Sequence, residues 1–212
     1  MSAERLQQAA VRRFADRGFA AVGIRELGRE VGVSSATLYH YAGSKEAVLA
    51  GIMRACLDEL VSAAERGLRS DDTSAERLAA LVCVHVSMSA LNPLTSRVTD
   101  RELWSLTADN RAQVIATRDR YEQLWSAVLR VGQRTGGFAL RPLELKTARL
   151  ALIDMCNGIA NWYDPSGSLS VRGLQRRYVE LACRLVGVAP PVSVPVISVA
   201  VLASEPLWRD NA

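Results

Sequence analysis

Residues 24–45 read IRELGREVGVSSATLYHYAGSK and have the pattern of two short helices joined by a tight turn. Ile24, Leu27 and Val31 recur at the spacing of one helical face and give the first helix an apolar side. Gly32 follows at the point where many helices end in a left-handed residue, a conformation that glycine adopts at no steric cost. The stretch is therefore predicted to begin with a short amphipathic helix that ends at a glycine.

The second helix of the pair is predicted over residues 36–41. Ser34 or Ser35 can cap it, because a serine hydroxyl accepts a hydrogen bond from the free N–H groups at a helix start. Val33 and Leu38 are expected in the core between the two helices. This is the pattern of a helix-turn-helix, whose second helix has the size to enter the major groove of double-stranded DNA.

These residues resemble the N-terminal domain of the TetR family of transcriptional regulators. The resemblance runs in order and without gaps through residues 14–19, 24–33 and 38–49, and so covers about the first fifty residues. Family members usually carry Thr or Ser, Ala and Phe at three positions where this chain departs from the pattern: Gly23, Gly28 and Tyr41. None of these departures removes a group expected to contact DNA.

The candidate DNA contacts lie on and around the second helix. Base recognition uses side chains at the start of that helix, and phosphate binding uses cations, hydroxyls and backbone N–H groups. The resemblance implies that Arg25 contacts a base or phosphate, and that Tyr39, Tyr41 and Lys45 reach the sugar-phosphate backbone. The alternative for Tyr41 is a position in the core. Serine and threonine lack the paired donors with which arginine binds guanine, so we expect this helix alone to give modest sequence specificity. The predicted DNA-binding residues are Arg25, Ser34, Ser35, Thr37, Tyr39, His40, Tyr41 and Lys45.

Composition is compatible with this function. The chain has 212 residues, 49% of them hydrophobic, and a formal net charge of +4, a mild basic excess that permits binding to nucleic acid. Its N-terminus is charged and lacks the apolar core of a signal peptide, and no run of roughly 18 apolar residues is evident. A cytoplasmic protein without a membrane partner is expected.

Enzymatic function is not favoured. The chain has two histidines, no cysteine or histidine cluster with metal-ligand spacing, no glycine-rich phosphate loop and no nucleophile motif. Asp154 and Asp164 are not placed as an acid/base pair. We therefore expect no catalytic residues, no metal and no cofactor.

The apolar spacing is helical wherever it is clear, so an all-α fold is predicted. A three-helix DNA-binding head over residues 1–46 is expected to precede a six-helix body over residues 47–188, with the connecting helix counted in the body. The tail, residues 189–212, is rich in valine and proline and is expected either as a loose extension or as an arm that lies on a partner subunit. The helices are predicted at residues 3–17, 24–31, 36–41, 44–69, 75–91, 94–106, 110–132, 142–163 and 171–186.

A homodimer is expected because one small head reads only one half-site, and two heads on a palindrome are needed for tight recognition. The resemblance implies that the last two helices, 145–163 and 171–186, pair with those of the partner in a four-helix bundle. Small residues on the first of them either permit this close approach or pack inside one subunit: Ala148, Ala151, Gly158 and Ala160.

TetR-like bodies enclose a small-molecule pocket, and its occupation changes the spacing of the two heads. Methionine and aromatic residues at helical spacing are also ordinary core residues, whereas a buried amide requires a hydrogen-bond partner that a ligand can supply. His85 is expected as a core histidine with satisfied hydrogen bonds. The predicted ligand-binding residues are Cys83, Ser87, Met88, Trp104, Tyr121, Trp125, Asn157 and Asn161.

Residues 161–170, NWYDPSGSLS, bear on the class of effector. They resemble a segment of TetR-type regulators of lipid and steroid catabolism, and several of those regulators respond to acyl-CoA thioesters. Asp164 replaces the usual basic residue, so a CoA pyrophosphate would need Arg111, Arg118 or Arg120. The predicted function is a dimeric repressor released from its operator by a small hydrophobic effector, with an acyl-CoA thioester as one candidate. The alternative is a redox-sensing regulator that uses Cys83 or Cys156.

Overall fold

The computed structural model describes residues 3–200 and 202, apart from the side chains of residues 3, 4, 35, 41 and 42. All regular structure in this part of the chain is helical, which confirms the all-α fold class. The nine α-helices are α1 (Ala3–Arg17), α2 (Ile24–Val31), α3 (Ser35–Ala42), α4 (Lys45–Gly67), α5 (Ser74–Leu91), α6 (Pro93–Arg101), α7 (Ala108–Arg134), α8 (Leu145–Asn157) and α9 (Val171–Val186). Three short 3-10 helices accompany them: η1 (Leu103–Ser105), η2 (Pro142–Glu144) and η3 (Gly158–Asn161).

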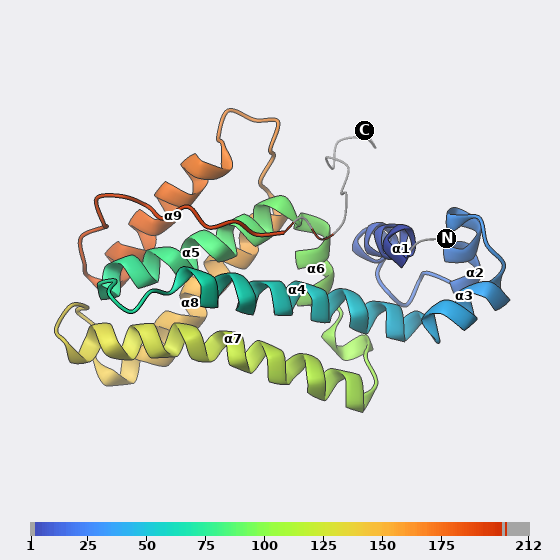
Figure 1. The fold of residues 1–212 in the computed structure, drawn as a ribbon, viewed down its shortest axis with the longest axis horizontal. Coiled ribbons are helices and arrows are strands. Elements are labelled where there is room, and N and C mark those ends of the chain that lie inside the picture. The colour runs from blue at the N-terminus through green and yellow to red at the C-terminus, as the bar shows by residue number, and fades with distance from the viewer. Residues whose placement is uncertain (1–2, 201, 203–212) are drawn as a thin grey trace.

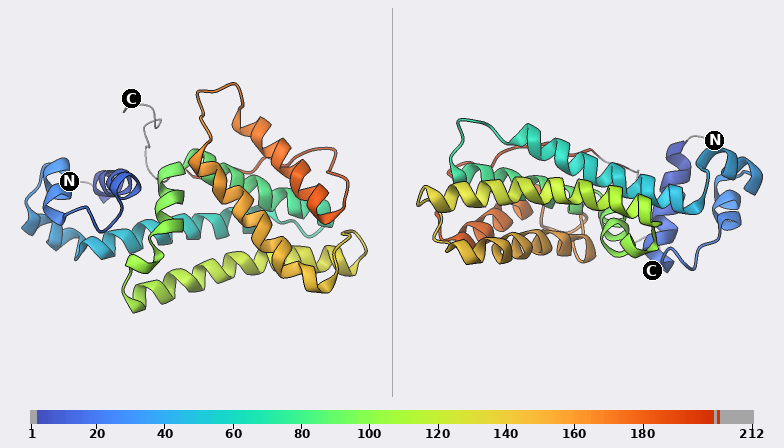
Figure 2. Two further views of the ribbon diagram at one scale, coloured as in Figure 1. Left: turned by 180° about the vertical axis from the view of Figure 1, so that it is seen from behind. Right: turned by 90° about the horizontal axis from the view of Figure 1, so that it is seen from below.

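The molecule is elongated, with the head at one end (Figure 1). Helices α1 to α3 form the head, and the long α4 runs from it into the body, where it lies beside α7. The two further views show the same separation of head and body (Figure 2). The head also touches the body where α1 packs against α6.

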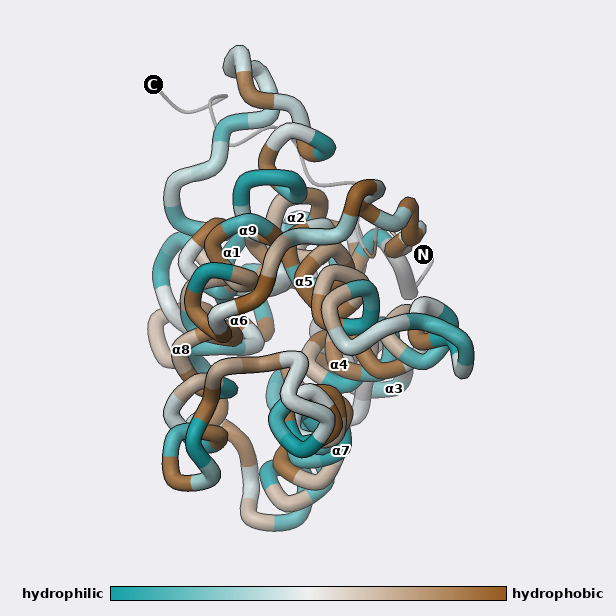
Figure 3. The backbone as a smooth tube through the Cα atoms, turned by 90° about the vertical axis from the view of Figure 1, so that its left-hand side faces the viewer, coloured by the Kyte–Doolittle hydropathy of each residue, from teal (hydrophilic) through white to brown (hydrophobic). Residues whose placement is uncertain are grey.

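Helix α5 is the core of the body. It packs against α4, α6, α7, α8 and α9 and lies near the centre of the end-on view (Figure 3). By length and mean hydropathy it is the one helix of the described residues that could span a membrane, although polar residues such as Glu76 and Arg77 interrupt it, so it is not a continuous apolar run. Because 72% of its residues are buried inside the molecule, we interpret it as a core helix.

The predicted helix over residues 142–163 is divided in the structure. A 3-10 turn, η2, precedes α8, and η3 replaces the last α-helical turn. The change from α8 to η3 occurs at Gly158, and glycine has a low helix propensity because it loses the most backbone entropy on ordering. Helix α5 begins at a capping box formed by Thr73 and Glu76, which fixes its first turn.

The sequence left two alternatives for the tail, a loose extension or an arm on a partner subunit. The described part of the tail instead lies along its own subunit. We call residues 188–200 together with residue 202 the strap. Buried Asn92, at the junction of α5 and α6, accepts from the N–H of Leu202 at 2.7 Å and donates to the carbonyl of Ala200 at 3.0 Å. Glu59 of α4 accepts from the N–H of Ala200 at 3.0 Å. Residue 201 and residues 203–212 of the predicted tail lie outside the described residues.

Candidate DNA-binding surface and effector cavity

The turn between α2 and α3 has helix-turn-helix geometry. Gly32 ends α2 with a left-handed φ of 76°, and the N–H of Val33 donates to the carbonyl of Gly28 at 2.8 Å. A Cβ added to Gly28 would lie 2.9 Å from the carbonyl oxygen of Val33. Because Gly28 has no Cβ, the backbone at Val33 can approach α2 more closely than the alanine usual at this position would allow.

Ser34, the first of the two predicted caps, caps α3. Its hydroxyl accepts from the N–H of Thr37 at 3.1 Å and lies 2.8 Å from the Thr37 hydroxyl. Arg25, Thr37 and His40 are exposed, and Tyr39 is half exposed. This exposure is what a DNA-binding surface requires, and contact with DNA stays a prediction for each of these residues. The side chains of two further candidates, Ser35 and Tyr41, lie outside the described residues.

Lys45 has a structural role that the sequence did not reveal. Its ammonium group donates to the carbonyls of Phe19 and Val22, both at 2.8 Å, and lies 3.9 Å from the centre of the Phe19 ring. Burial lowers the pKa of Lys45, an effect that nearby Glu102 opposes. Since an ammonium group has three donors, one is left for a phosphate. Lys45 therefore holds the loop between α1 and α2 against the start of α4.

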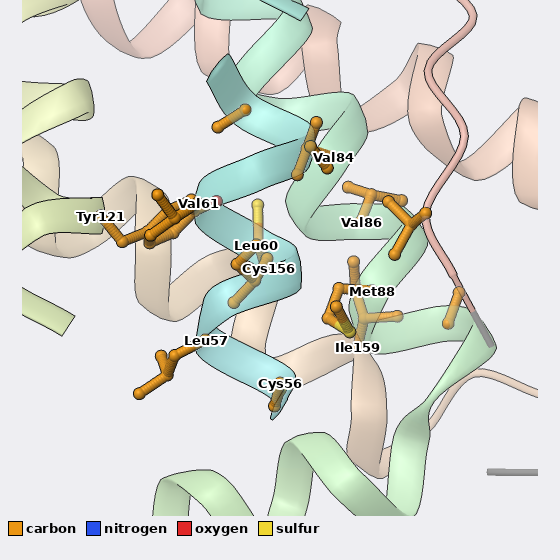
Figure 4. Close-up of a cluster of buried hydrophobic side chains, with 14 of the residues drawn as sticks. Cys56, Leu57, Leu60, Val61, Val84, Val86, Met88, Tyr121, Cys156 and Ile159 are labelled. Carbon is orange, nitrogen blue, oxygen red and sulfur yellow. The ribbon is translucent and has the colours of Figure 1, made fainter. Parts of the chain in front are cut away.

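A cavity of about 230 Å³ lies in the body between α4, α5, α6, α7 and α8 and opens to the surface, where Leu150 is 41% exposed. Its apolar side is formed mainly by α4 and α8, and Figure 4 shows Cys56, Leu57 and Leu60 on α4 and Met88 on the neighbouring α5. The remaining wall is polar. Its members are His85, Ser89, Ser96, Thr99, Asp100, Arg118, Tyr121, Glu122, Asp154 and Asn157.

Three polar side chains of this wall form a hydrogen-bonded row. The Nε2 atom of His85 lies 2.8 Å from Oδ1 of Asn157, and its Nδ1 atom lies 3.1 Å from the hydroxyl of Tyr121. Burial lowers the pKa of His85 to about 4, so the ring is neutral at pH 7. A neutral ring that donates from Nε2 to Asn157 accepts from Tyr121 at Nδ1, which satisfies both of its nitrogens. His85 is thus a buried histidine with satisfied hydrogen bonds, as expected, and it also lines the cavity.

Three of the eight predicted ligand-binding residues line the cavity: Met88, Tyr121 and Asn157. Trp125 is fully buried behind them, with its ring centre 6.3 Å from that of His85. The structure does not place the other four at the cavity. Trp104 is 78% exposed, and its ring lies against the guanidinium of Arg111.

Asn161, Cys83 and Ser87 also lie away from the cavity. Asn161 is exposed and accepts from Arg101 at 2.7 Å. Cys83 and Ser87 are buried on the face of α5 that meets α9, where the amide nitrogen of Gln175 donates to the Ser87 hydroxyl at 2.8 Å. Most of α5 is buried, so burial alone does not distinguish the face of this helix that meets the cavity.

The sequence analysis missed the contribution of α6, which supplies Ser96, Thr99 and Asp100 to the cavity. The same helix ends beside the head, where Oε1 of Glu102 accepts from the N–H of Phe19 at 3.0 Å. Helix α6 therefore forms a wall of the cavity, and Glu102 at its C-terminal cap contacts the head.

The cysteines do not support a redox sensor. The four cysteines are all buried: Cys56, Cys83, Cys156 and Cys183. Burial raises the pKa of Cys83 to about 12 and raises that of Cys156 as well. Since the thiolate is the form that oxidants attack, both candidate sensor thiols are held in their unreactive state.

Comparison with known proteins identifies the family. The profile described as "Bacterial regulatory proteins, tetR family" matches residues 6–52. The profile described as "Tetracyclin repressor-like, C-terminal domain" matches residues 71–186, more than half of the chain.

The chain belongs to the TetR family.

TetR-family relatives resemble it over most of its length. The transcriptional repressor KstR2 of Rhodococcus jostii (strain RHA1) is 28% identical over 179 residues, which is 84% of this chain and 86% of that protein. The structure of the regulator PfmR from Thermus thermophilus is 32% identical, with a TM-score of 0.75, and the match covers 85% of this chain and 97% of that one. The chain is thus a TetR-family transcriptional repressor, in a family of DNA-binding regulators rather than enzymes.

A third relative was solved with ligands. The structure of AibR in complex with isovaleryl coenzyme A and operator DNA is 21% identical, with a TM-score of 0.74, and the match covers 85% of this chain and 97% of that one. At this identity the likeness shows the fold alone.

Proposed function

We propose that this TetR-family repressor works in the cytoplasm as a homodimer, binds a palindromic operator, and releases it when a small hydrophobic effector enters the cavity. Residues 1–46 are the proposed DNA-binding domain, and residues 47–188 the proposed ligand-binding and dimerisation domain. The observation that carries the proposal is the position of α6, which lines the cavity and contacts the head. An effector that fits only one position of α6 would shift the population toward it, and the head would follow.

Dimerisation through α8 and α9 is supported by their exposed apolar side chains. Leu181 and Leu185 of α9 are 46% and 41% exposed, and Trp162, just after η3, is 51% exposed. Large apolar side chains grouped on one surface favour burial against a partner. Of the small residues predicted to face the partner, Ala151 is exposed, Gly158 is half-buried, and Ala148 and Ala160 pack inside the subunit.

An acyl-CoA thioester is the effector that we propose. The support is the fold shared with AibR, whose structure holds isovaleryl coenzyme A, together with the size of the cavity. A volume of about 230 Å³ is below the range of complete drug-sized pockets, so it suits a short acyl group rather than the whole thioester. Of the arginines considered for the pyrophosphate, Arg118 lines the cavity, whereas Arg120 pairs with Glu65 at 2.6 Å and Arg111 lies on Trp104.

Footprinting on the DNA that flanks the coding region of the protein tests the proposal, with and without a panel of acyl-CoA thioesters. A protected palindrome that one thioester releases supports operator, repression and effector class together. Protection that no thioester disturbs contradicts the effector class, and no protection on any flanking fragment contradicts the operator assignment. Replacement of both Leu181 and Leu185 by glutamate should give a monomer in sedimentation and abolish protection.

A further inference from the structure

One face of α7 runs from the cavity toward the start of that helix and carries two arginines. Arg118 lines the cavity, and Ile115 and Arg111 precede it in α7. Spacings of three, four and seven residues place these side chains on the same face of an α-helix. At 1.5 Å per residue, Arg111 lies about 10 Å from Arg118 along the helix axis. The face between them is open to solvent, because Ile115 is 37% exposed.

Trp104, in η1, lies at the end of this face that is remote from the cavity. Its ring lies against Arg111, with 5.1 Å between the guanidinium carbon and the ring centre, and the residue is 78% exposed. The ring therefore touches a cation and is otherwise largely open to solvent. An open aromatic ring beside an arginine is suited to stack a nucleobase, because every base has a π-face. We call Trp104, Arg111, Ile115 and Arg118 the α7 track.

The two arginines of the α7 track have donors available for an anion. Arg111 and Arg118 each donate to one backbone carbonyl, at 3.4 and 3.1 Å, and neither is paired with a carboxylate in the described part of the chain. A guanidinium has five N–H donors, and its planar shape matches phosphate oxygens. Arg120 of the same helix differs, since it is paired with Glu65 at 2.6 Å. The α7 track thus carries positive charge that no described carboxylate neutralises by direct contact.

The acidic residues nearby do not cancel this charge. Asp100 and Asp154 belong to the cavity end of the track and are exposed, so water and salt screen them from a group bound at Arg111. The remaining carboxylate of the cavity lining is paired with Arg149 at 2.9 Å. Asp109 is two residues from Arg111, and side chains at that spacing point to different sides of a helix. A phosphate is therefore favoured at Arg111, at the end of the track away from the cavity.

We propose that the α7 track binds the nucleotide half of an acyl-CoA effector whose acyl group occupies the cavity. The adenine stacks on Trp104, the pyrophosphate binds Arg111, and the pantetheine arm lies over Ile115. Arg118 donates to a carbonyl of the arm where it leaves the cavity. The inference rests on the proposed effector class and deepens it, because it places the part of the thioester for which a cavity of about 230 Å³ has no room.

Calorimetry on the full-length protein with a matched pair of thioesters tests the inference. Butyryl-CoA is compared with butyryl-N-acetylcysteamine, which keeps the acyl thioester and lacks the nucleotide. We expect butyryl-CoA to bind about tenfold more tightly or better, since one base stacked on an aromatic ring contributes at least this much. The advantage should shrink as the salt concentration rises, because phosphate contacts are screened. Equal affinity of the pair, or no binding of butyryl-CoA, would overturn the inference.

Three variants assign the nucleotide to the α7 track. Trp104→Ala and Arg111→Ala should each weaken butyryl-CoA by about tenfold. Both should leave butyryl-N-acetylcysteamine within twofold, because neither side chain lines the cavity. Trp104→Phe keeps an aromatic ring and should recover most of the affinity. Arg111→Ala should also reduce the salt dependence of butyryl-CoA binding, which a purely structural role of Arg111 would not do.

Arg120→Ala is the matched control, since Arg120 is an exposed arginine of the same helix outside the α7 track. It should leave the affinity for butyryl-CoA unchanged. Full affinity for butyryl-CoA in Trp104→Ala and Arg111→Ala contradicts the assignment. An equal loss for both thioesters, or an equal loss in Arg120→Ala, contradicts it as well.

ATP separates a thioester site from a site for a free adenine nucleotide. We expect ATP to bind more weakly than butyryl-CoA, because it places no acyl group in the cavity. Binding of ATP that is as tight as that of butyryl-CoA would assign the α7 track to a free nucleotide and overturn the inference.

Operator release is measured separately by footprinting, so the two proposals fail differently. Release by butyryl-CoA at the same concentration in the wild type, Trp104→Ala and Arg111→Ala would keep the proposed function and discard the α7 track. Binding of butyryl-CoA that depends on the α7 track, without release of any operator, would keep the track and discard the proposed function.

Discussion

Replacement of Lys45 by alanine is expected to unfold the head more readily, in addition to any loss of DNA affinity. The ammonium group donates to two backbone carbonyls at 2.8 Å and stacks on the Phe19 ring at 3.9 Å. Because the site is only partly buried and water can reach the carbonyls, each lost hydrogen bond costs about 1 kcal/mol and the lost ring contact about 0.5–1 kcal/mol. The expected loss of stability is therefore about 2–3 kcal/mol, which lowers the melting temperature of a protein of this size by roughly 4–12 °C.

Thermal unfolding of the full-length protein, followed by circular dichroism, measures this loss. Arg25→Ala is the control, because Arg25 is an exposed cation of the same head. It should leave the melting temperature unchanged and weaken operator binding. If Lys45→Ala also keeps its melting temperature, and instead lowers the salt dependence of operator binding by about one ion, the structural role is refuted and Lys45 acts as a phosphate contact alone.

Three further predictions concern the body. Glu102→Gln weakens the hydrogen bond that the N–H of Phe19 donates at the end of α6. Effector affinity measured by calorimetry should stay within twofold, while release of the operator should need a higher effector concentration. Unchanged release would show that this contact does not couple the cavity to the head. Burial lowers the pKa of His85 to about 4 from an ordinary value of 6.5, so the unfolded chain binds a proton in that window that the folded chain does not. The free energy of unfolding should then fall by up to about 3 kcal/mol as the pH falls through the window, and His85→Gln should remove this slope in urea titrations. Asn92→Ala removes both hydrogen bonds that hold the end of the strap. Proteolysis within the strap should then be faster, and the free energy of unfolding should fall by about 2 kcal/mol. An unchanged cleavage rate would contradict the role of Asn92.

The head was predictable in detail from the sequence because its signals are local. A cap such as Ser34, a left-handed glycine such as Gly32 and the spacing of Ile24, Leu27 and Val31 act within a few residues of one another, and all three appear in the structure. The helix count and the bounds of most helices followed for the same reason. Two predicted helices are exceptions. The helix predicted at 142–163 changes to a 3-10 turn at Gly158, and the helix predicted at 94–106 ends at Arg101 and is followed by the separate 3-10 turn η1. Apolar spacing alone does not separate the two helical forms.

The cavity was decided by tertiary structure. Which face of α5 meets the cavity depends on the angles at which five other helices pack against it, and periodicity cannot distinguish faces of a helix that is mostly buried. Trp104 was chosen for its aromatic ring yet lies at the surface, whereas Ser96 and Thr99 have the composition of a solvated helix and yet are enclosed. Lys45 belongs to the same class, because its two carbonyl partners lie more than twenty residues away in the sequence.

The sequence by itself therefore determined the family, the DNA-binding head and the all-α fold, since these depend on short-range patterns of capping, turn and periodicity. Tertiary structure alone decided which side chains share the cavity, where the strap lies and which polar groups stay unpaired. Those properties arise from contacts between residues far apart in the chain, and no local pattern encodes the distances between them.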